Sequence, residues 1–359
     1  MNAIRFFRNK KILITGHTGF IGSWLTRWLT SLNADVCGYS LDPPTEPNMF
    51  ATIDLKERII DVRGDIRDKQ KLSNVIAKFK PEIVFHLAAQ PIVLESYNSP
   101  YETFETNVMG TVNLLDLLRK VDSVKVVLVM TSDKVYRNNG RGHPYGEKDP
   151  LWGKDPYSAS KSCQDIVVNS FRESYFTDAG GGISSVRAGN VIGGGDWARH
   201  RIIPDLIRGI MNNEVTMIRN PNSVRPWQFV LEPISGMLAL AERMWTETKY
   251  SGVWNFGPDE MKEITVKELV DKFLEYYGKG SYTIDQQANF REANYLRLNI
   301  SKAKKELDWH PRFDFESSLR YTVEWYMDYL NGRKNMDLVT MTQIKKYSSR
   351  AGNGEWNVG

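Results

Sequence analysis

A tyrosine and a lysine four residues apart could together remove the hydroxyl proton during the oxidation of an alcohol. Tyr157 and Lys161 lie in a segment with helical periodicity, and their spacing puts both side chains on one helical face. There the ammonium can lower the pKa of the phenol toward the working pH. A hydroxyl at Thr131, at the end of a preceding apolar run, can share the proton of the alcohol. The three residues predict proton removal from an alcohol.

A glycine-rich turn near the amino terminus predicts a bound dinucleotide. The apolar run 11–15 leads directly into GHTGFIG at 16–22, and a helical pattern follows. Glycines allow a tight turn and a close approach of the backbone to a pyrophosphate, whose charge a helix amino terminus favours. Asp42 stands twenty positions beyond Gly22, at the end of the next apolar run. This combination is the one expected for a dinucleotide-binding unit.

The segment 40–49, SLDPPTEPNM, predicts NAD rather than NADP. It contains two carboxylates and neither Arg nor Lys, so a 2′-phosphate would be repelled. Asp42, with Ser40 as an alternative, is expected to bind the ribose hydroxyls. Asp65 and Ile66 follow the third strand and are expected at the adenine. The complete set of expected NAD contacts is Gly16, Thr18, Gly19, Phe20, Ile21, Gly22, Ser40, Asp42, Asp65, Ile66, Leu87, Ala88, Ala89, Asn107, Thr131, Tyr157 and Lys161.

The elements that must position these residues form an α/β pattern. Short apolar runs at 11–15, 35–39, 59–63, 82–86, 124–130 and 182–187 alternate with segments of helical periodicity. Such strands predict a doubly wound parallel sheet of the Rossmann type, covered by helices on both faces. We expect a dinucleotide domain over 1–188, to which 226–258 partly returns. A smaller, loop-rich lobe is expected over 189–340, where a second ligand would bind, and a polar tail over 341–359.

Composition excludes several other classes of protein. The chain has 359 residues, 41% hydrophobic and 25% charged, which argues against a disordered chain. Its net charge of +4 is spread over interspersed signs, so a nucleic-acid partner is not expected. The two cysteines, Cys37 and Cys163, lack partners at metal-ligand spacing, so no metal is expected. No run approaches a membrane span, and we expect a cytoplasmic protein.

Longer strings identify a family. GHTGFIGSWL, HLAAQP, NVMGT, TSDKVY, DPYSASK, VRAGNVIGGGDW, IRNPNSVRPWQ and WNFGP closely resemble the CDP-glucose 4,6-dehydratases of the extended short-chain dehydrogenase/reductase superfamily. The resemblance covers roughly residues 8–330. It implies NAD-dependent conversion of CDP-glucose to CDP-4-keto-6-deoxyglucose, by C4 oxidation, loss of water across C5 and C6, and return of hydride to C6. Its setting would be the synthesis of bacterial O-antigen dideoxysugars.

The resemblance also implies roles for an adjacent acid and base. Tyr157, held by Lys161, takes the C4 hydroxyl proton, and Thr131 hydrogen-bonds the same oxygen. Lys134 is the candidate base for the C5 proton, and Asp133 the candidate acid for the departing C6 oxygen. These tasks require a protonated Asp133 and a deprotonated Lys134, opposite to their ordinary states near pH 7. The two residues act either separately or as a coupled pair.

The same resemblance predicts the nucleotide-sugar contacts and the assembly. Asn190 and Arg225 are expected at the pyrophosphate, since an Arg fork matches phosphate oxygens. The complete set of expected substrate contacts is Gln90, Asn190, Trp197, Arg201, Ile203, Ile218, Arg219, Asn220, Arg225, Arg291 and Glu292. Helices around 102–120 and 157–176 carry apolar residues on more than one face, and related enzymes pair through these helices. A homodimer or homotetramer is expected.

Two alternatives stay open on the sequence. One is another nucleotide-sugar 4,6-dehydratase or a 4-epimerase, acting on a UDP, GDP or dTDP sugar. The other is an NAD-binding protein that kept the fold and lost the chemistry, because a fold does not by itself imply a function.

Overall fold

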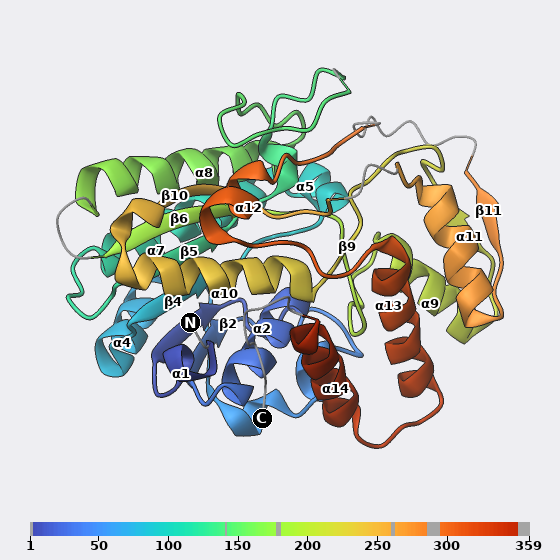
Figure 1. The fold of residues 1–359 in the computed structure, drawn as a ribbon, viewed down its shortest axis with the longest axis horizontal. Helices are drawn as coiled ribbons and strands as arrows, with labels where there is room; N and C mark the ends of the chain where they lie inside the picture. Colours follow the sequence, from blue (N-terminus) through green and yellow to red (C-terminus); the bar gives the residue numbers. More distant parts are fainter. Residues whose placement is uncertain (1–2, 141, 177–180, 260–262, 286–294, 351–359) are drawn as a thin grey trace.

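A seven-stranded parallel sheet forms the centre of the molecule (Figure 1). The computed structural model describes residues 3–140, 142–176, 181–259, 263–285 and 295–350. The strands follow the order β10-β6-β5-β4-β1-β2-β3. Their bounds are β1 Lys11–Thr15, β2 Asp35–Ser40, β3 Ile60–Arg63, β4 Ile83–His86, β5 Val126–Met130, β6 Gly182–Arg187 and β10 Gly252–Asn255. The prediction of a doubly wound parallel sheet is confirmed.

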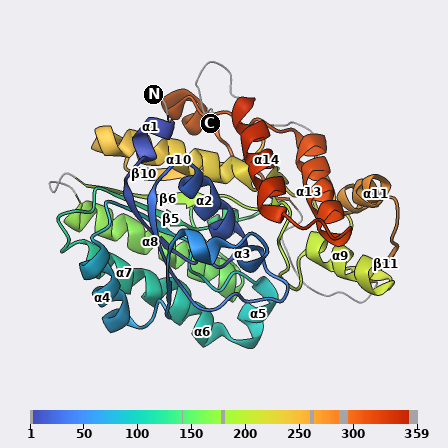
Figure 2. The same cartoon turned by 90° about the horizontal axis from the view of Figure 1, so that it is seen from below.

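Helices cover both faces of this sheet, which explains its continuous apolar strands. In Figure 2, α10 lies on the opposite side of the sheet from α7 and α8. One face carries α2 Phe20–Ser31 and α10 Leu231–Thr246, with α1 Ala3–Phe7 and α12 Ser301–Leu307 packed on α10. The other carries α4 Lys69–Phe79, α7 Gly110–Leu118 and α8 Pro156–Tyr175. The four strand residues 126–129 are consequently almost fully buried.

Shorter elements connect these layers. The helices α3 Met49–Thr52, α5 Val93–Asn98 and α6 Pro100–Phe104 stand before α7, and a π-helical turn η2, Glu105–Met109, joins α6 to α7. In the described part of the chain, the 3-10 turns are η1 Leu55–Arg58, η3 Asp133–Val135 and η4 Thr248–Tyr250. Among the described helices, none is both long and apolar enough to cross a membrane.

A smaller lobe lies beside the carboxyl ends of the strands, at the right of Figure 1. It contains α9 Ile202–Asn212, α11 Val266–Tyr277, α13 Phe315–Leu330 and the paired strands β8 Thr216–Ile218 and β11 Tyr282–Ile284. A second short pair, β7 Val191–Ile192 and β9 Gln228–Phe229, links it to the sheet domain. The lobe therefore faces the strand ends from which the glycine turn and the candidate catalytic residues emerge.

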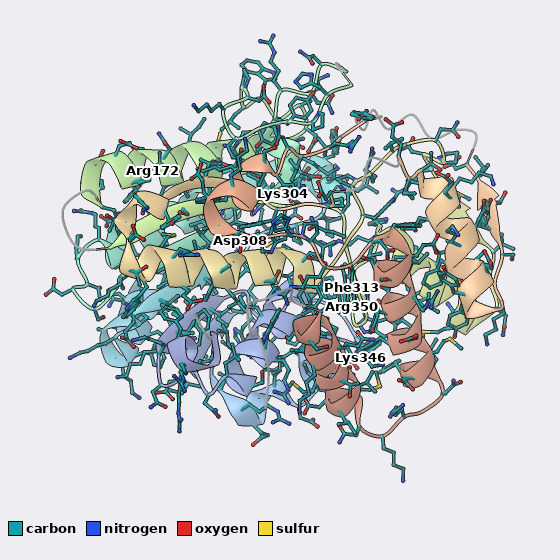
Figure 3. All side chains as sticks on the ribbon, in the orientation of Figure 1. Arg172, Lys304, Asp308, Phe313, Lys346 and Arg350 are labelled. Carbon is teal, nitrogen blue, oxygen red and sulfur yellow. The ribbon has the colours of Figure 1, made fainter. Side chains whose placement is uncertain are left out.

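The expectation of a polar tail from residue 341 is wrong for 341–349, which belong to the helix α14, Met336–Ser349. Tyr347 is fully buried and donates to the Glu232 carboxylate over 2.6 Å. Burial raises the pKa of Glu232 to about 7, although Tyr347 opposes the shift. Just beyond α14, Arg350 lies 4.9 Å over the ring of Phe313 (Figure 3). These contacts fasten the helix to the core.

The sheet order creates a natural crevice for a ligand. The chain leaves β1 toward β2 and β3, and then returns to β4 on the other side of β1. The loops that follow β1 and β4 therefore diverge, which is the switch point where open α/β sheets bind ligands. The glycine turn follows β1, and residues 87–89 follow β4.

Candidate active site

A cleft of about 1270 Å³ opens between these strand ends and the smaller lobe. It exceeds the volume of roughly 300–1,000 Å³ that is usual for one small ligand. The predicted site residues that line it are Gly16, Thr18, Gly19, Phe20, Ile21, Gly22, Ser40, Asp42, Asp65, Ile66, Leu87, Ala88, Ala89, Gln90, Thr131, Asp133, Lys134, Tyr157, Lys161, Asn190, Trp197, Arg201, Ile203, Ile218, Arg219, Asn220 and Arg225. Arg291 and Glu292 lie outside the described residues.

The glycine turn is shaped to receive a pyrophosphate. Gly16 has φ +78°, and a Cβ there would lie 2.6 Å from the Ala88 nitrogen. A Cβ on Gly22 would lie 2.1 Å from the Gly16 carbonyl oxygen. The helix α2 starts after Gly19 without a side-chain cap, so its first N–H groups remain for an anion. The residues present therefore fit a dinucleotide.

A cation that the sequence did not predict, Arg63, lies next to Asp42 at the adenosine end of the cleft. The carboxylate of Asp42 is exposed at the end of β2, and the Arg63 Nε on β3 lies 3.5 Å from it. The Arg63 Nη2 contacts Asp61 over 2.9 Å. Two carboxylates thus flank one guanidinium, and the surroundings keep a net negative charge. Ser40 hydrogen-bonds Thr18 over 2.8 Å and borders the same region.

Asp65 and Ile66 line the cleft beyond the third strand, as predicted, but the Asp65 carboxylate is already engaged. The Arg67 Nη2 lies 2.6 Å from it, and this hydrogen bond lowers the pKa of Asp65. Arg67 also contacts Glu105 over 2.7 Å. Ile66 is therefore the apolar surface that this segment offers to a base.

Asn107, predicted as a cofactor contact, lies instead behind the cleft wall. It is fully buried, and its amide donates to the Ser160 hydroxyl over 2.9 Å and to the Gln90 carbonyl over 3.2 Å. Its carbonyl accepts the Gln90 N–H over 2.8 Å. The Gln90 side chain in turn donates to Thr103 over 2.9 Å. Asn107 therefore braces the segment after β4 rather than touching a ligand in the cleft.

The hydroxyl beside Tyr157 belongs to Ser132, not to Thr131. The Thr131 Oγ1 contacts the Asp165 carboxylate at 3.1 Å and the Val186 carbonyl at 3.2 Å, behind the strand end. Ser132, by contrast, forms a hydrogen bond with the Tyr157 phenol that lowers its pKa. Ser132 also lines the cleft. The hydroxyl role that the sequence assigned to Thr131 therefore falls to its neighbour.

Tyr157 and Lys161 lie in the first two turns of α8, which Asp155 caps by accepting the Ser158 N–H. Burial raises the pKa of Tyr157 to about 12, opposed by the Ser132 hydrogen bond and the Arg201 charge. Burial also lowers the pKa of Lys161 to about 7. Ser132 and Arg201 therefore favour the phenolate of Tyr157, and the expectation that Lys161 also does so stays a prediction.

Asp133 is held as a buried carboxyl group. It is 1% exposed, at the start of the turn η3, and accepts the Asn190 amide over 3.0 Å and the Ser132 hydroxyl over 3.2 Å. Burial raises its pKa, and the charges of Lys134 and Arg225 oppose this shift. Lys134 follows it in the same turn, half-buried at the cleft. A carboxyl group in this setting can keep its proton and act as an acid.

The predicted substrate residues fall into two groups. Asn190, at φ +50°, directs its amide at Asp133, and Arg201 pairs with Asp196 over 3.0 Å. These residues and Arg225 carry polar atoms close to the catalytic end. Trp197 is instead buried, with its ring 5.3 Å from that of Tyr326. It joins Ile203 and Ile218, both buried, as an apolar wall, and Arg219 and Asn220 are half-buried at the same cleft.

Two further residues beside Arg225 were missed by sequence reasoning. Trp227 lines both the cleft and a small adjoining pocket, and Arg297 lines that pocket with Arg225. Among the described residues, the buried Trp227 Nε1 has no hydrogen-bond partner. The string VRPWQ contains Trp227, so that residue could have been found there. Arg297 comes from a distant segment that only the fold brings close.

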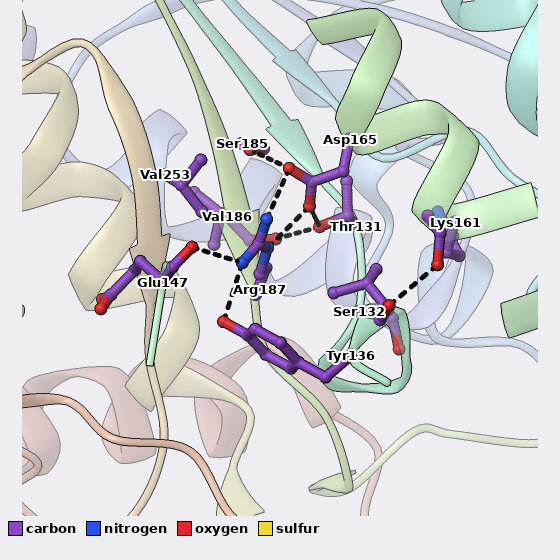
Figure 4. A network of polar contacts seen from close by, with 12 residues as sticks. Thr131, Ser132, Tyr136, Glu147, Lys161, Asp165, Ser185, Val186, Arg187 and Val253 are labelled. Atoms are coloured by element: carbon purple, nitrogen blue, oxygen red, sulfur yellow. Dashed lines mark hydrogen bonds and ion pairs between the residues drawn. The ribbon is translucent and has the colours of Figure 1, made fainter. Parts of the chain in front are cut away.

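A buried ion pair supports the strand ends (Figure 4). Arg187 on β6 contacts Asp165 on α8 through Nε at 2.8 Å and Nη2 at 3.0 Å. Its Nη1 donates to the Tyr136 hydroxyl over 2.9 Å. Because Thr131 hydrogen-bonds the same carboxylate, the network fixes the end of β5 that carries Ser132 and Asp133.

Comparisons with known proteins identify the family of this chain. The sequence model of the GDP-mannose 4,6 dehydratase family matches residues 13–322. A CDP-glucose 4,6-dehydratase of Salmonella typhimurium is 48% identical, over 96% of this chain and 98% of that protein. The structure of a dTDP-glucose 4,6-dehydratase from Bacillus anthracis in complex with NAD superimposes with a TM-score of 0.74 and 24% identity, over 91% and 99% of the two chains.

A solved UDP-glucose 4-epimerase from Stenotrophomonas maltophila, with bound NAD and formylated UDP-arabinopyranose, has a TM-score of 0.78 and 21% identity, over 90% and 99% of the chains. This likeness concerns the fold alone. The family match and the relative at 48% identity show the family as well as the fold, because they span nearly the whole chain. The chain therefore belongs to the GDP-mannose 4,6 dehydratase family.

Proposed function

We propose that this protein converts CDP-glucose to CDP-4-keto-6-deoxyglucose with NAD as its resident cofactor, in the synthesis of bacterial O-antigen dideoxysugars. The observation that carries the proposal is the pair Asp133 and Lys134 at the cleft, beside Ser132 and Tyr157. An epimerase has no task for this additional acid and base. The 48% identity to a CDP-glucose 4,6-dehydratase supports the choice of nucleotide.

Oxidation at C4 needs a group that removes the hydroxyl proton. Tyr157 is the candidate base, and Ser132 shares its hydrogen bond. The pKa of Tyr157 is raised to about 12 by burial, so cationic neighbours must stabilise the phenolate. Lys161 and Arg201 are the candidates, since both line the same cleft. Together these residues hold the proton that the alcohol loses.

Loss of water across C5 and C6 needs an acid and a base. Asp133 keeps a proton because burial raises its pKa, and it donates that proton to the departing C6 oxygen. Lys134 takes the C5 proton, which the neighbouring C4 ketone makes acidic. The N–H of Lys134 donates to the Ser132 hydroxyl over 3.2 Å, so the turn η3 keeps the oxidation and dehydration groups together.

The residues that would hold NAD are the glycine turn, Asp42, the Ile66 surface and residues 87–89. Bound there, NAD would supply the hydride chemistry, as acceptor of the hydride from C4 and donor of the same hydride to C6. The carboxylates near Arg63 favour the unphosphorylated ribose. Arg225, Arg297 and Trp227 lie where the nucleotide diphosphate would enter, and the guanidinium groups match its oxygens.

Product analysis tests the function. The purified protein is incubated with NAD and, in separate reactions, with CDP-, UDP-, GDP- and dTDP-glucose. The expected result is a 4-keto-6-deoxy sugar from CDP-glucose at a rate well above the other three. A C4 epimer would identify an epimerase, and a keto product from another nucleotide would identify a different dehydratase. NAD binding without turnover of any sugar would contradict catalysis.

Replacing Asp42 with alanine is expected to shift cofactor preference toward NADP. The change removes a charge-assisted partner of the ribose, and it leaves Arg63, within 3.5 Å of the lost carboxylate, next to the 2′ position. The affinity for NAD should fall by about ten- to a hundredfold, since such a hydrogen bond contributes about 1.5–3 kcal/mol. Titration calorimetry with both cofactors measures the shift. Asp35→Ala, at the opposite end of β2, should leave both affinities unchanged, and an unaltered NAD preference in Asp42→Ala would refute the assignment.

A homodimer is proposed on exposed apolar side chains of α5, α6, η2 and α8. Tyr97, Tyr101, Met109 and Ile166 are all exposed on these neighbouring elements. Isolated apolar residues are ordinary on a surface, but a group of them on adjacent helices indicates an interface. Light scattering at micromolar concentration should give at least twice the mass of one chain. A monomeric mass would contradict the proposal.

A further inference from the structure

The ammonium group of Lys161 rests on two fixed acceptors behind the cleft. Its Nζ donates to the Gln164 Oε1 over 2.9 Å and to the Met130 carbonyl over 3.2 Å. Gln164 is fully buried, one turn beyond Lys161 on α8. An ammonium has three donor hydrogens. The Gln164 and Met130 oxygens accept two of these hydrogens. Because Lys161 also borders the cleft, the third hydrogen can point into it.

The orientation of the Gln164 amide is set by a buried hydrogen-bond chain. Its Nε2 donates to the Thr111 Oγ1 over 2.8 Å, and Thr111 donates its single proton to the backbone carbonyl of Asn107 over 2.7 Å. Thr111 must therefore accept from the His86 Nε2, 2.9 Å away. The His86 Nδ1 then accepts from Thr15, at 2.7 Å. Because burial lowers the pKa of His86 to about 3, this ring stays neutral.

These hydrogen bonds allow only one orientation of the Gln164 side-chain amide. If the amide were reversed, its carbonyl would face Thr111, whose proton is already donated to Asn107. Two acceptors would then oppose each other in a buried site, which costs the desolvation of both. The carbonyl of Gln164 must face Lys161, and α7 and β4 thereby specify the acceptor that the lysine meets.

We propose that Gln164 is a positioning residue that keeps Lys161 protonated and aimed into the cleft beside Tyr157. The inference rests on the proposed function only in giving Lys161 the task of stabilising the Tyr157 phenolate. Gln164 acts through Lys161 and touches neither sugar nor cofactor. A buried amide carbonyl favours the ammonium over the neutral amine, because it accepts a charge-assisted hydrogen bond.

Because the pKa of Lys161 lies near neutral pH, the Gln164 carbonyl can decide whether Lys161 is protonated there. Burial lowers the pKa of Lys161 to about 7, and the charge of Asp165, on the same helix, opposes the shift. The neutral His86 on β4 also interacts with the charge of Lys161, and Tyr157 lies one turn before Lys161 on α8. Met130 on β5 contributes only its backbone carbonyl. A lysine with a pKa of about 7 changes its protonation state near neutral pH.

Two substitutions of similar size should move the pH–rate profile in opposite directions. The ammonium is the active form, so activity is lost as the pH rises through the pKa of Lys161. Gln164→Met removes the acceptor and should shift the alkaline limb of kcat down by about one pH unit. Gln164→Glu adds a negative charge and should shift it up by a similar amount. Gln70→Met, on the exposed face of α4, should leave the profile unchanged.

Direct titration of Lys161 separates this inference from the proposed function. The ligand-free protein, labelled with ¹³C-lysine, is titrated by NMR, and Lys161→Met identifies the signal that disappears. The Lys161 pKa should fall by about one unit in Gln164→Met and rise in Gln164→Glu. Equal pKa values in all three proteins, or a shift of the same sign in both variants, would overturn the inference. Failure to turn over CDP-glucose would refute only the proposed function.

Discussion

Lys134→Met is expected to stop formation of the keto-deoxy sugar while C4 oxidation continues. Lys134 is half-buried at the cleft, in the turn that also carries Ser132 and Asp133. Methionine matches its length and cannot take a proton from C5. A positioned base contributes roughly 10²–10⁴-fold, so product formation should fall by at least about a hundredfold. The absorbance of reduced nicotinamide should still appear when CDP-glucose is added.

The control for this variant is Lys154→Met, which removes an exposed lysine. It should match the wild-type protein in product formation and in thermal unfolding. Deuterium uptake at C5 from heavy water gives a second measurement, because it reports proton removal without requiring the full reaction. Wild-type uptake or wild-type turnover in Lys134→Met would remove Lys134 from the role of base and leave it to another group.

The sequence identified the catalytic helix but misassigned the strand-end hydroxyl, for a geometric reason. A spacing of four between Tyr157 and Lys161 survives an error of one or two residues in a helix boundary, because both residues move together. At the end of a strand, neighbouring side chains point to opposite faces. An assignment that is one residue off therefore selects the wrong side, which is why Thr131 was chosen and Ser132 faces Tyr157.

Other differences arise from contacts between distant segments. The segment 40–49 itself contains no Arg or Lys. The pairing of β2 with β3, however, brings Arg63 opposite Ser40. No local pattern reveals that register. The helix α14 was read as a polar tail because Thr340, Gln343 and Ser348 are buried there beside Ile344 and Tyr347. Polar residues in a packed interface hide the apolar periodicity that predicts a helix.

Gly189→Ala is expected to inactivate the enzyme by displacing its acid. A Cβ at residue 189 would lie 2.0 Å from the Asp133 Cγ and 2.1 Å from each carboxylate oxygen. The carboxyl group would have to leave the Asn190 amide that holds it over 3.0 Å. Since a positioned acid contributes roughly 10²–10⁴-fold, kcat for dehydration should fall by about a hundredfold or more. The fold should persist, because the clash meets one side chain rather than backbone.

Adding Asp133→Gly to Gly189→Ala distinguishes displacement of the Asp133 carboxyl group from a wider disturbance of the active site. In Gly189→Ala/Asp133→Gly, the clash is gone along with the acid, so the double variant should be no slower than Asp133→Gly alone. Gly146→Ala is the matched control, because its Cβ would meet only an Asp149 oxygen at 3.8 Å. A double variant much slower than Asp133→Gly would mean that alanine at 189 acts through other contacts. Non-additivity would instead tie the glycine to the acid, since only a residue without a Cβ leaves room for the carboxyl group beside Asn190.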